Sequence, residues 1–208
     1  MKTTSSRFSS SIEFSGLRIA SGGSVYPPAE DSFMLAEHCK CLKGRILEIG
    51  TGSGIAAIAN AKANPGNEII AVDLNPEALE CAKENAARNG VKNIAFVQSD
   101  LFGNVSGKFD AILFNPPYLP TSEEERLDGD ENRAYDGGAE GREATEKFLA
   151  QFGGHLRQDG ALLIVQSSLS GAEETGQKLE AMGFKVEAVA EESFFFERLS
   201  LLRAQRTM

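Results

Sequence analysis

The stretch that most constrains the fold is the glycine-rich segment at residues 47–54, which reads Leu-Glu-Ile-Gly-Thr-Gly-Ser-Gly. The apolar run at residues 46–49 is typical of a buried strand, and the run of alanine and isoleucine at residues 55–63 is typical of a helix. Glycines in the turn between them let the backbone bend sharply and come close to a ligand. The first N–H groups of the helix would then point at that ligand. This segment predicts a strand, a ligand-binding turn and a helix.

The rest of the chain alternates between expected strands and expected helices. Such alternation predicts parallel β-α-β units and an α/β fold whose sheet is covered on both faces. The last two strands are joined too tightly for a crossover helix, so we expect them to be antiparallel. The expected strands span residues 46–49, 67–73, 93–100, 109–115, 160–166, 184–190 and 194–203, and the expected helices span residues 30–42, 55–63, 76–89, 141–157 and 172–182.

Length and composition limit the class of protein. We expect one domain at residues 17–208, preceded by residues 1–16 as a flexible tail or an edge strand. The net charge of −9 argues against a non-specific nucleic-acid binder, because such proteins present a basic face. The three cysteines are an odd number in a chain with no secretory signal, which favours a reducing, cytoplasmic location. No apolar run is long enough to span a membrane.

We expect no metal site. His38, Cys39 and Cys41 lie close together, but an expected helix turns neighbouring side chains to different faces, and no second pair of ligands is nearby. The polar, acidic loop at residues 119–138 lacks the glycine and the twelfth-position acid of an EF-hand. A partly buried helix end explains the first group. The loop is either a mobile acidic segment or part of the substrate groove.

Polar signals follow the first four expected strands: the glycine turn, Asp73, Asp100 and Asn115. The carboxyl ends of parallel strands meet at one edge of a sheet, where ligands bind. Residues 48–54 read E-x-G-x-G-x-G, with Gly50, Gly52 and Gly54, whereas a dinucleotide fingerprint needs its last glycine at position 55. The acid Glu48 beside the turn suits a ligand that carries an ammonium or sulfonium cation.

These groups match S-adenosylmethionine better than NAD. Asp73 is placed for the two hydroxyls of a ribose, and Leu74 for packing against a purine face. Asp100 could accept a hydrogen bond from the exocyclic adenine amine, while the Leu101 backbone donates to the ring. Asp73 also has a structural alternative, as the cap of the helix that follows it.

The run Asn115-Pro116-Pro117-Tyr118 forms a second cluster, at the end of the fourth expected strand. Its prolines make a rigid turn that presents the Asn115 amide oxygen and the Pro116 carbonyl side by side. Two such acceptors can hold an –NH2 group and orient its lone pair, and Tyr118 can stack on a planar amide or base. We expect Asn115, Pro116 and Tyr118 to be catalytic and residues 115–118 to bind the substrate. A purely structural turn is the alternative.

Taken together, the chain resembles the class I S-adenosylmethionine-dependent methyltransferases that act on amino nitrogen, and most of all their small HemK-related branch from eukaryotes and archaea. The N-P-P-Y motif, which adenine-N6 DNA methyltransferases share, carries the resemblance with residues 25–32, 47–54, 136–141 and 195–200. The resemblance implies a three-layer Rossmann-like fold with a seven-stranded, mostly parallel sheet in the order 3-2-1-4-5-7-6, the last strand being antiparallel. It also implies a cofactor site lined by Ser32, Glu48, Gly50, Asp73, Asp100, Leu101 and Asn115.

The activity that the resemblance implies is methylation of the side-chain amide nitrogen of the glutamine in the Gly-Gly-Gln loop of a class-one translation release factor. Three alternatives remain open: adenine-N6 methylation of nucleic acid, methylation of a lysine in another protein or of a small molecule, and a non-catalytic scaffold. The related branch pairs the edge formed by the third strand with a small zinc-binding activator protein, so we expect a heterodimer formed by β-augmentation. We expect neither a membrane nor a nucleic acid as a partner.

Overall fold

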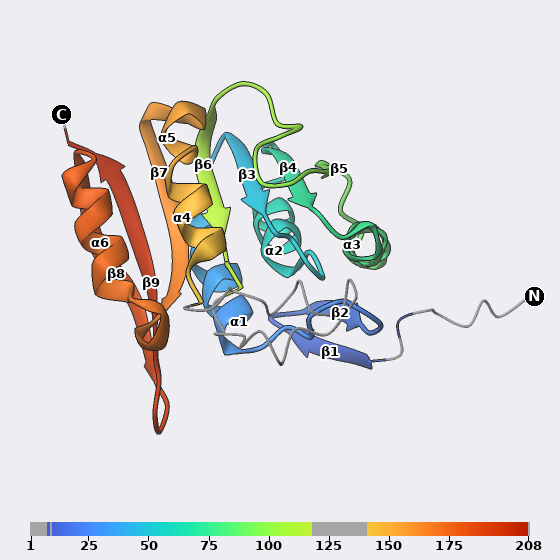
Figure 1. Cartoon of the computed structure of the whole chain (residues 1–208). Helices are drawn as coiled ribbons and strands as arrows, with labels where there is room; N and C mark the ends of the chain where they lie inside the picture. Colours follow the sequence, from blue (N-terminus) through green and yellow to red (C-terminus); the bar gives the residue numbers. More distant parts are fainter. Residues whose placement is uncertain (1–7, 9, 118–140, 208) are drawn as a thin grey trace, which may run out of the picture.

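The structure, a computed structural model, describes residues 8, 10–117 and 141–207. A seven-stranded sheet lies between two layers of helices (Figure 1). Its strands are β3 (Arg45–Ile49), β4 (Glu68–Asp73), β5 (Ile94–Gln98), β6 (Phe109–Phe114), β7 (Leu156–Ser167), β8 (Phe184–Ser193) and β9 (Arg198–Arg206). The helices are α1 (Glu30–His38), α2 (Ile55–Ala63), α3 (Pro76–Arg88), α4 (Glu143–Leu149), α5 (Phe152–His155) and α6 (Ala172–Ala181).

The strand order is β5-β4-β3-β6-β7-β9-β8, and β9 is antiparallel to both of its neighbours. This is the 3-2-1-4-5-7-6 order that the family resemblance implied, so the α/β fold and its topology are confirmed. The parallel strands β3, β4, β5 and β6 all end at the same edge of the sheet. The turns that carry the polar signals of the sequence therefore meet at this edge.

Each face of the sheet is covered by its own helices, because successive side chains of a strand point to opposite faces. Ile46 of β3 packs with α1 and α2 in one core, whereas its neighbour Leu47 packs in the other core with Phe148 of α4 and Leu179 of α6. The helix α2 is buried along most of its length, since its alanines allow it to lie close to the sheet. In the part of the chain that the structure describes, no helix is long and apolar enough to cross a membrane.

The prediction of one continuous helix at residues 141–157 is wrong. The chain forms two short helices there, α4 and α5, and β7 already begins at Leu156, which pairs with Phe109 of β6. Gly153 and Gly154 are poor helix formers and weaken a continuous helix. The other helix whose end differs is α1, which stops at His38 and continues as one 3-10 turn over Cys39–Cys41.

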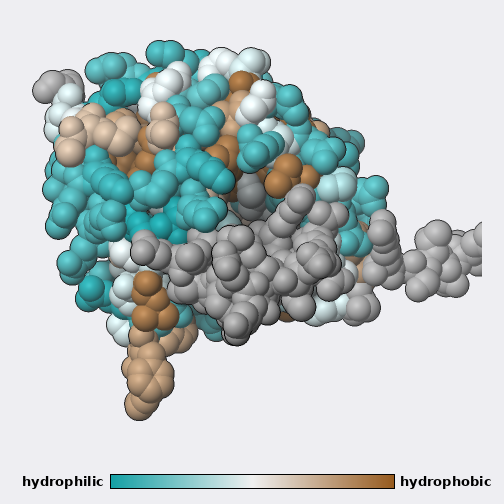
Figure 2. Space-filling view, in the orientation of Figure 1, coloured by the Kyte–Doolittle hydropathy of each residue, from teal (hydrophilic) through white to brown (hydrophobic). Residues whose placement is uncertain are grey.

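The hairpin of β8 and β9 is longer than its sequence pattern predicts. The strand β8 runs to Ser193 and β9 begins only at Arg198, so residues 194–197 form the tip. The tip projects beyond the other strands in Figure 1 and stands out as an apolar protrusion in Figure 2.

The N-terminal part of the chain forms a hairpin of β1 (Ser10–Phe14) and β2 (Leu17–Ser21), where the sequence suggested at most one strand. Both residues of its turn, Ser15 and Gly16, have positive φ, of 51° and 74°, as in a tight two-residue hairpin turn. The buried Asn85 of α3 holds the hairpin in place: its amide accepts from Ala20 N at 2.9 Å and donates to Ala20 O at 2.8 Å. The boundary expected at residue 16 thus falls inside this turn.

Candidate active site

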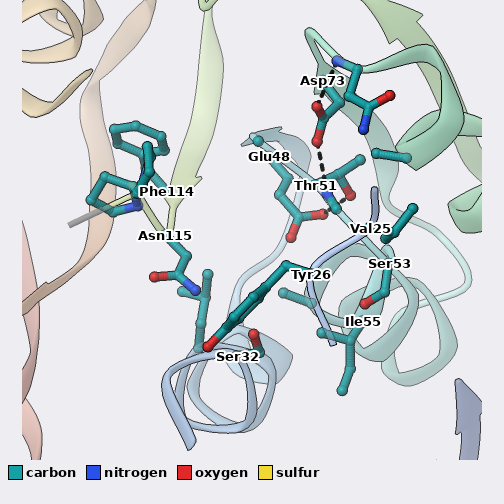
Figure 3. A pocket seen from close by; sticks show the side chains of 18 of the residues that line it. Val25, Tyr26, Ser32, Glu48, Thr51, Ser53, Ile55, Asp73, Phe114 and Asn115 are labelled. Carbon is teal, nitrogen blue, oxygen red and sulfur yellow. Dashed lines mark hydrogen bonds between the residues drawn. The ribbon is translucent and has the colours of Figure 1, made fainter. Parts of the chain in front are cut away.

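A cavity opens at the carboxyl ends of β3, β4 and β6, where the polar signals were expected to meet. The first turn of α1 and the segment before it close its other side (Figure 3). Of the residues expected in the site, the cavity is lined by Ser32, Glu48, Gly50, Gly52, Asp73, Leu74, Asn115, Pro116 and Pro117. Residue Tyr118 of the expected site lies outside the described residues.

The glycine turn joins β3 to α2 and lines the cavity between Glu48 and Asp73. Gly52 has a φ of 54°, and its N–H donates to Asp73 Oδ2 at 2.8 Å. Gly54 has a φ of 82° and does not line the cavity; a Cβ there would lie 2.9 Å from the Cβ of Ala82 in α3. The first of these glycines shapes the ligand site, and the last allows α2 and α3 to pack closely.

Glu48 is a buried acid at the end of β3. Its Oε2 accepts hydrogen bonds from Thr51 Oγ1 at 2.7 Å and from Ala57 N at 3.1 Å. Burial raises the pKa of this carboxyl from 4.5 to about 7, against the effect of those two bonds. Figure 3 shows the carboxylate pointing into the cavity. A cationic ligand group beside it would favour the ionised form.

Asp73 closes the cavity on the side of β4. Its two carboxylate oxygens accept from Gly52 N at 2.8 Å and from Asn75 N at 2.9 Å, while burial raises its pKa. The structural alternative for this acid was a helix cap. The structure gives that role to Asn75, whose side chain accepts from the N–H of Glu77 at the start of α3. Asp73 therefore ties the glycine turn to β4 and keeps oxygen lone pairs at the cavity wall.

The turn after β5 lies apart from the cavity lining. Asp100 is exposed, and neither it nor Leu101 is among the lining residues. Leu101 has a φ of 45°, an unfavourable value for this residue type, and Ser99 Oγ donates to its carbonyl at 2.9 Å. Strained backbone of this kind often marks a functional turn. Leu74, on the neighbouring turn, is exposed at the cavity rim, as a surface for a purine would be.

Asn115 has two differently placed amide atoms. Its Nδ2 donates to Asp31 Oδ2 at 3.0 Å, whereas its Oδ1 is buried and has no hydrogen-bond partner among the described residues. A buried acceptor without a partner is energetically costly. The arrangement therefore leaves a site for an N–H donor at the cavity wall, beside Pro116.

Sequence reasoning missed Asp31, which lies near the start of the expected helix at residues 30–42. The N-cap is Ala29, without a side-chain hydrogen bond, and Asp31 is buried against the cavity. Its Oδ1 accepts from Ser32 N at 2.6 Å and from Ser32 Oγ at 3.1 Å. The prolines just before it were a usable signal, because they force an extended approach that brings the start of α1 over the strand ends. Tyr26, also missed, lines the same cavity.

A metal site is not found among the described residues, where no group of three or more histidine, cysteine or acidic side chains is close enough to hold an ion. At the end of α1, where the sequence places His38, Cys39 and Cys41 close together, His38 Nδ1 lies 2.9 Å from Met34 O. The neighbouring Cys39 is buried, and burial raises the pKa of its thiol. These residues form the partly buried end of α1 and its 3-10 turn.

Comparisons with known proteins relate the chain to methyltransferases. The family model "Methyltransferase small domain" matches residues 30–128. A protein of Methanocaldococcus jannaschii named "Putative protein N5-glutamine methyltransferase" is 48% identical over 94% of this chain and 98% of its own length. "Methyltransferase HEMK2" of Mus musculus is 30% identical over 88% of this chain and 90% of its own.

A solved structure shares the fold. The E. cuniculi Mtq2–Trm112 complex, described as responsible for methylation of the eRF1 translation termination factor, includes a chain that matches with a TM-score of 0.69 at 23% identity. The match covers 89% of the present chain and 100% of that one. On the strength of these relatives, the chain belongs to the HemK-related family of S-adenosylmethionine-dependent class I methyltransferases, which includes the protein glutamine methyltransferase named above.

Proposed function

We propose that this chain transfers a methyl group from S-adenosylmethionine to the side-chain amide nitrogen of the glutamine in the Gly-Gly-Gln loop of a class-one translation release factor. The observation that carries the proposal is the Asn115 Oδ1 atom, buried and without a partner among the described residues, in a cavity that also holds two buried acids. The names of the relatives support a glutamine side chain as the acceptor and a termination factor as the substrate.

The residues of the cavity fit the proposed cofactor. Glu48 would hold its cationic amino-acid end, and Asp73 would accept from the hydroxyls of its ribose. Leu74 would pack on the purine, whereas Asp100 and the strained Leu101 backbone lie on the next turn, outside the cavity lining. Ser32 and the glycine turn would complete the site. When bound, S-adenosylmethionine supplies a methyl group on a sulfonium, which is already an activated electrophile.

The protein's part in the transfer is to position the amide. Asn115 Oδ1 and the Pro116 carbonyl would accept from the two hydrogens of the glutamine –NH2, which aims the nitrogen lone pair and stabilises the positive charge that develops on the nitrogen. The glutamine nitrogen would take the methyl group in place of one of its hydrogens, and the displaced proton would pass to solvent. Tyr118, expected to stack on the amide, completes the proposed substrate site.

Asp31 sets the orientation of this acceptor. By accepting from Asn115 Nδ2 at 3.0 Å it holds the amide with its oxygen directed away from itself. We assign Asp31 a positioning role, since it acts through Asn115.

The proposal is preferred to adenine methylation because of charge. Both activities use the N-P-P-Y motif, but the net charge of −9 disfavours a polyanionic substrate. A lysine of another protein or a small molecule stays as a second acceptor class, and retention of both acids with the motif argues against a scaffold. The three cysteines are free, which supports a cytoplasmic location.

The test is mass spectrometry of the Gly-Gly-Gln peptide of a class-one release factor after incubation with the chain and isotope-labelled S-adenosylmethionine. We expect label on the glutamine side chain, and none with the Asn115→Ala variant. Parallel reactions with DNA and with a lysine-rich protein separate the alternatives. Label on these but not on the glutamine would overturn the proposal.

We also propose that a small zinc-binding activator pairs with β5. This strand has β4 on one side and no strand on the other among the described residues. Ser99 N donates to Asp73 O, so the N–H of this residue points toward β4. Successive N–H groups of a strand point to opposite sides, and those of Ile94, Phe96 and Gln98 therefore point away from β4. Added activator should therefore slow hydrogen exchange at these three amides. Unchanged exchange, with the complex formed, would rule out β-augmentation at this edge.

A further inference from the structure

The tip of the β8–β9 hairpin exposes aromatic side chains that no described part of the chain covers. Phe195 is 91% exposed and Phe196 is 83% exposed, and Phe194 is exposed as well. Leu169, in the 3-10 turn Ser168–Ser170 at the base of the hairpin, is a further exposed apolar residue. Phenylalanine is among the residue types most often buried, so a cluster of them in solvent indicates a binding surface.

The tip is held in one shape. Phe194 N donates to Glu197 O at 2.7 Å, and the rings of Phe195 and Phe196 lie edge to face at 4.5 Å. At the base, Arg198 N donates to Ser168 Oγ at 3.0 Å, which ties the hairpin to the end of β7. A surface that is already ordered loses little conformational entropy when a partner binds.

The tip lies at the same edge of the sheet as the cavity. The strand β8 is antiparallel to β9, which is antiparallel to β7, so β8 ends at the carboxyl edge of the parallel strands. From the end of β6, the sheet order places β7, β9 and β8 as the next strands, a lateral distance of about 10–15 Å. A folded domain whose loop enters the cavity at Asn115 would therefore reach the tip. The edge strand β5 lies at the opposite side of the sheet (Figure 1).

The charges around the tip select the partner. Glu191 and Glu192 precede it at the surface, and Glu197 follows the three phenylalanines. Arg198 pairs with Glu191, with Nε and Oε1 3.7 Å apart. An apolar tip flanked by acids fits an apolar depression with basic surroundings. Proteins that contact nucleic acid present such a basic surface, whereas an anionic lipid surface would be repelled by the acids of the tip.

We infer that the tip, residues 194–197, is the docking element that recognises the body of the release factor while the Gly-Gly-Gln loop occupies the cavity. The inference rests on the proposed function and adds a second contact to it. Recognition at the tip would select a folded protein, since a short peptide that enters the cavity would not reach it. The aromatic rings would be the main source of affinity for the substrate.

The test compares the double variant Phe195→Ser/Phe196→Ser with the wild-type chain, each assayed with its activator, on intact release factor and on a short Gly-Gly-Gln peptide. Both side chains are exposed, so we expect the variant to fold and bind S-adenosylmethionine normally. With intact release factor its KM should rise about tenfold or more at unchanged kcat. With the peptide its kcat/KM should equal that of the wild type.

Met182→Ser is the matched control, because Met182 is an exposed apolar residue just before β8, at the opposite edge of the sheet. It should leave both substrates unaffected. An unchanged KM for release factor in the double variant, with the wild type active, would overturn the inference alone; an inactive wild type would overturn the proposed function with it. Loss of dimerisation or of lipid-vesicle binding in the double variant, with KM unchanged, would assign the tip to a second copy or to a membrane and also overturn the inference.

Discussion

The two sides of the cavity differ in whether their polar atoms already have partners. On the side of β3 and β4, Glu48 and Asp73 each accept two hydrogen bonds from within the protein. On the side of β6, Asn115 Oδ1 is buried with no partner among the described residues. The acids of the first side are already held by the protein, whereas the second side has an acceptor that a donor from outside would complete. This difference supports the proposed roles of the two sides, with the cofactor on the side of β3 and β4 and the substrate amide on the side of β6.

The largest loss of activity should come from removing the unpartnered acceptor Asn115 Oδ1. Asn115→Ala removes an acceptor that we assign to the transition state, and should lower kcat for methyl transfer by about a hundredfold to a thousandfold or more. Calorimetry should show S-adenosylmethionine binding largely unchanged. Gln151→Ala, which changes an exposed amide side chain between α4 and α5, is the matched control and should keep its activity. Normal methylation by Asn115→Ala would show that Asn115 Oδ1 is not the acceptor for the substrate amide.

The other side should respond in cofactor affinity. Glu48→Gln keeps the shape of the side chain and the acceptor for Thr51 and Ala57 but removes the negative charge. We expect the Kd for S-adenosylmethionine to rise about tenfold to a hundredfold, and the wild-type affinity to weaken below pH about 7 as Glu48 takes up a proton. Titration calorimetry across pH 5.5–8.5 measures both. Glu68→Gln, at the opposite end of β4, is the control, and an equal loss there would contradict the assignment.

A smaller loss of activity should follow when Asn115 is kept but the hydrogen bond that orients its amide is changed. Asp31→Asn offers Asn115 both an acceptor and a donor, so the Asn115 amide can turn and its oxygen is no longer fixed. We expect kcat to fall about tenfold while the Kd for cofactor changes little. Glu30→Gln, one residue earlier and exposed, should have no effect. If Asp31→Asn changed only the cofactor Kd, Asp31 would belong to the other side.

The smallest effect concerns stability. The pKa of Glu48 is raised on folding, from 4.5 to about 7, so the folded state binds its proton more tightly than the unfolded state. The stabilisation this gives is present below pH 4.5 and is lost as the pH rises to about 7. Without cofactor, Glu48→Gln should therefore be more stable than the wild type by on the order of 2 kcal/mol at pH 8, and by little at pH 4.5. Thermal unfolding at the two pH values checks the sign.

Much of this architecture could be predicted because its signals are local. The apolar run and glycines at residues 46–54 predict β3, the turn and α2, and the Asn75-Pro76 pair predicts the start of α3. The predictions that were wrong concern segments in which tertiary contacts outweigh the secondary-structure preference of the local sequence. The hairpin of β1 and β2 depends on the side chains of Asn85 in α3 and Asn89 just after it, which hydrogen-bond to the backbone of β2 as a neighbouring strand would.

Within the site, the order of residues already specifies which polar groups stand at the ends of the strands, because strand direction and the parallel sheet place Glu48, Asp73 and Asn115 at one edge. The hydrogen bonds that these groups make depend on the packing of distant elements. Asp31 and Asn115 are 84 residues apart, and their hydrogen bond forms because α1, packed against α2 and β7, brings its first turn to the residue that follows β6. The orientation of the Asn115 amide, and with it the buried oxygen on which the proposed activity depends, is a property of that packing and of no local pattern.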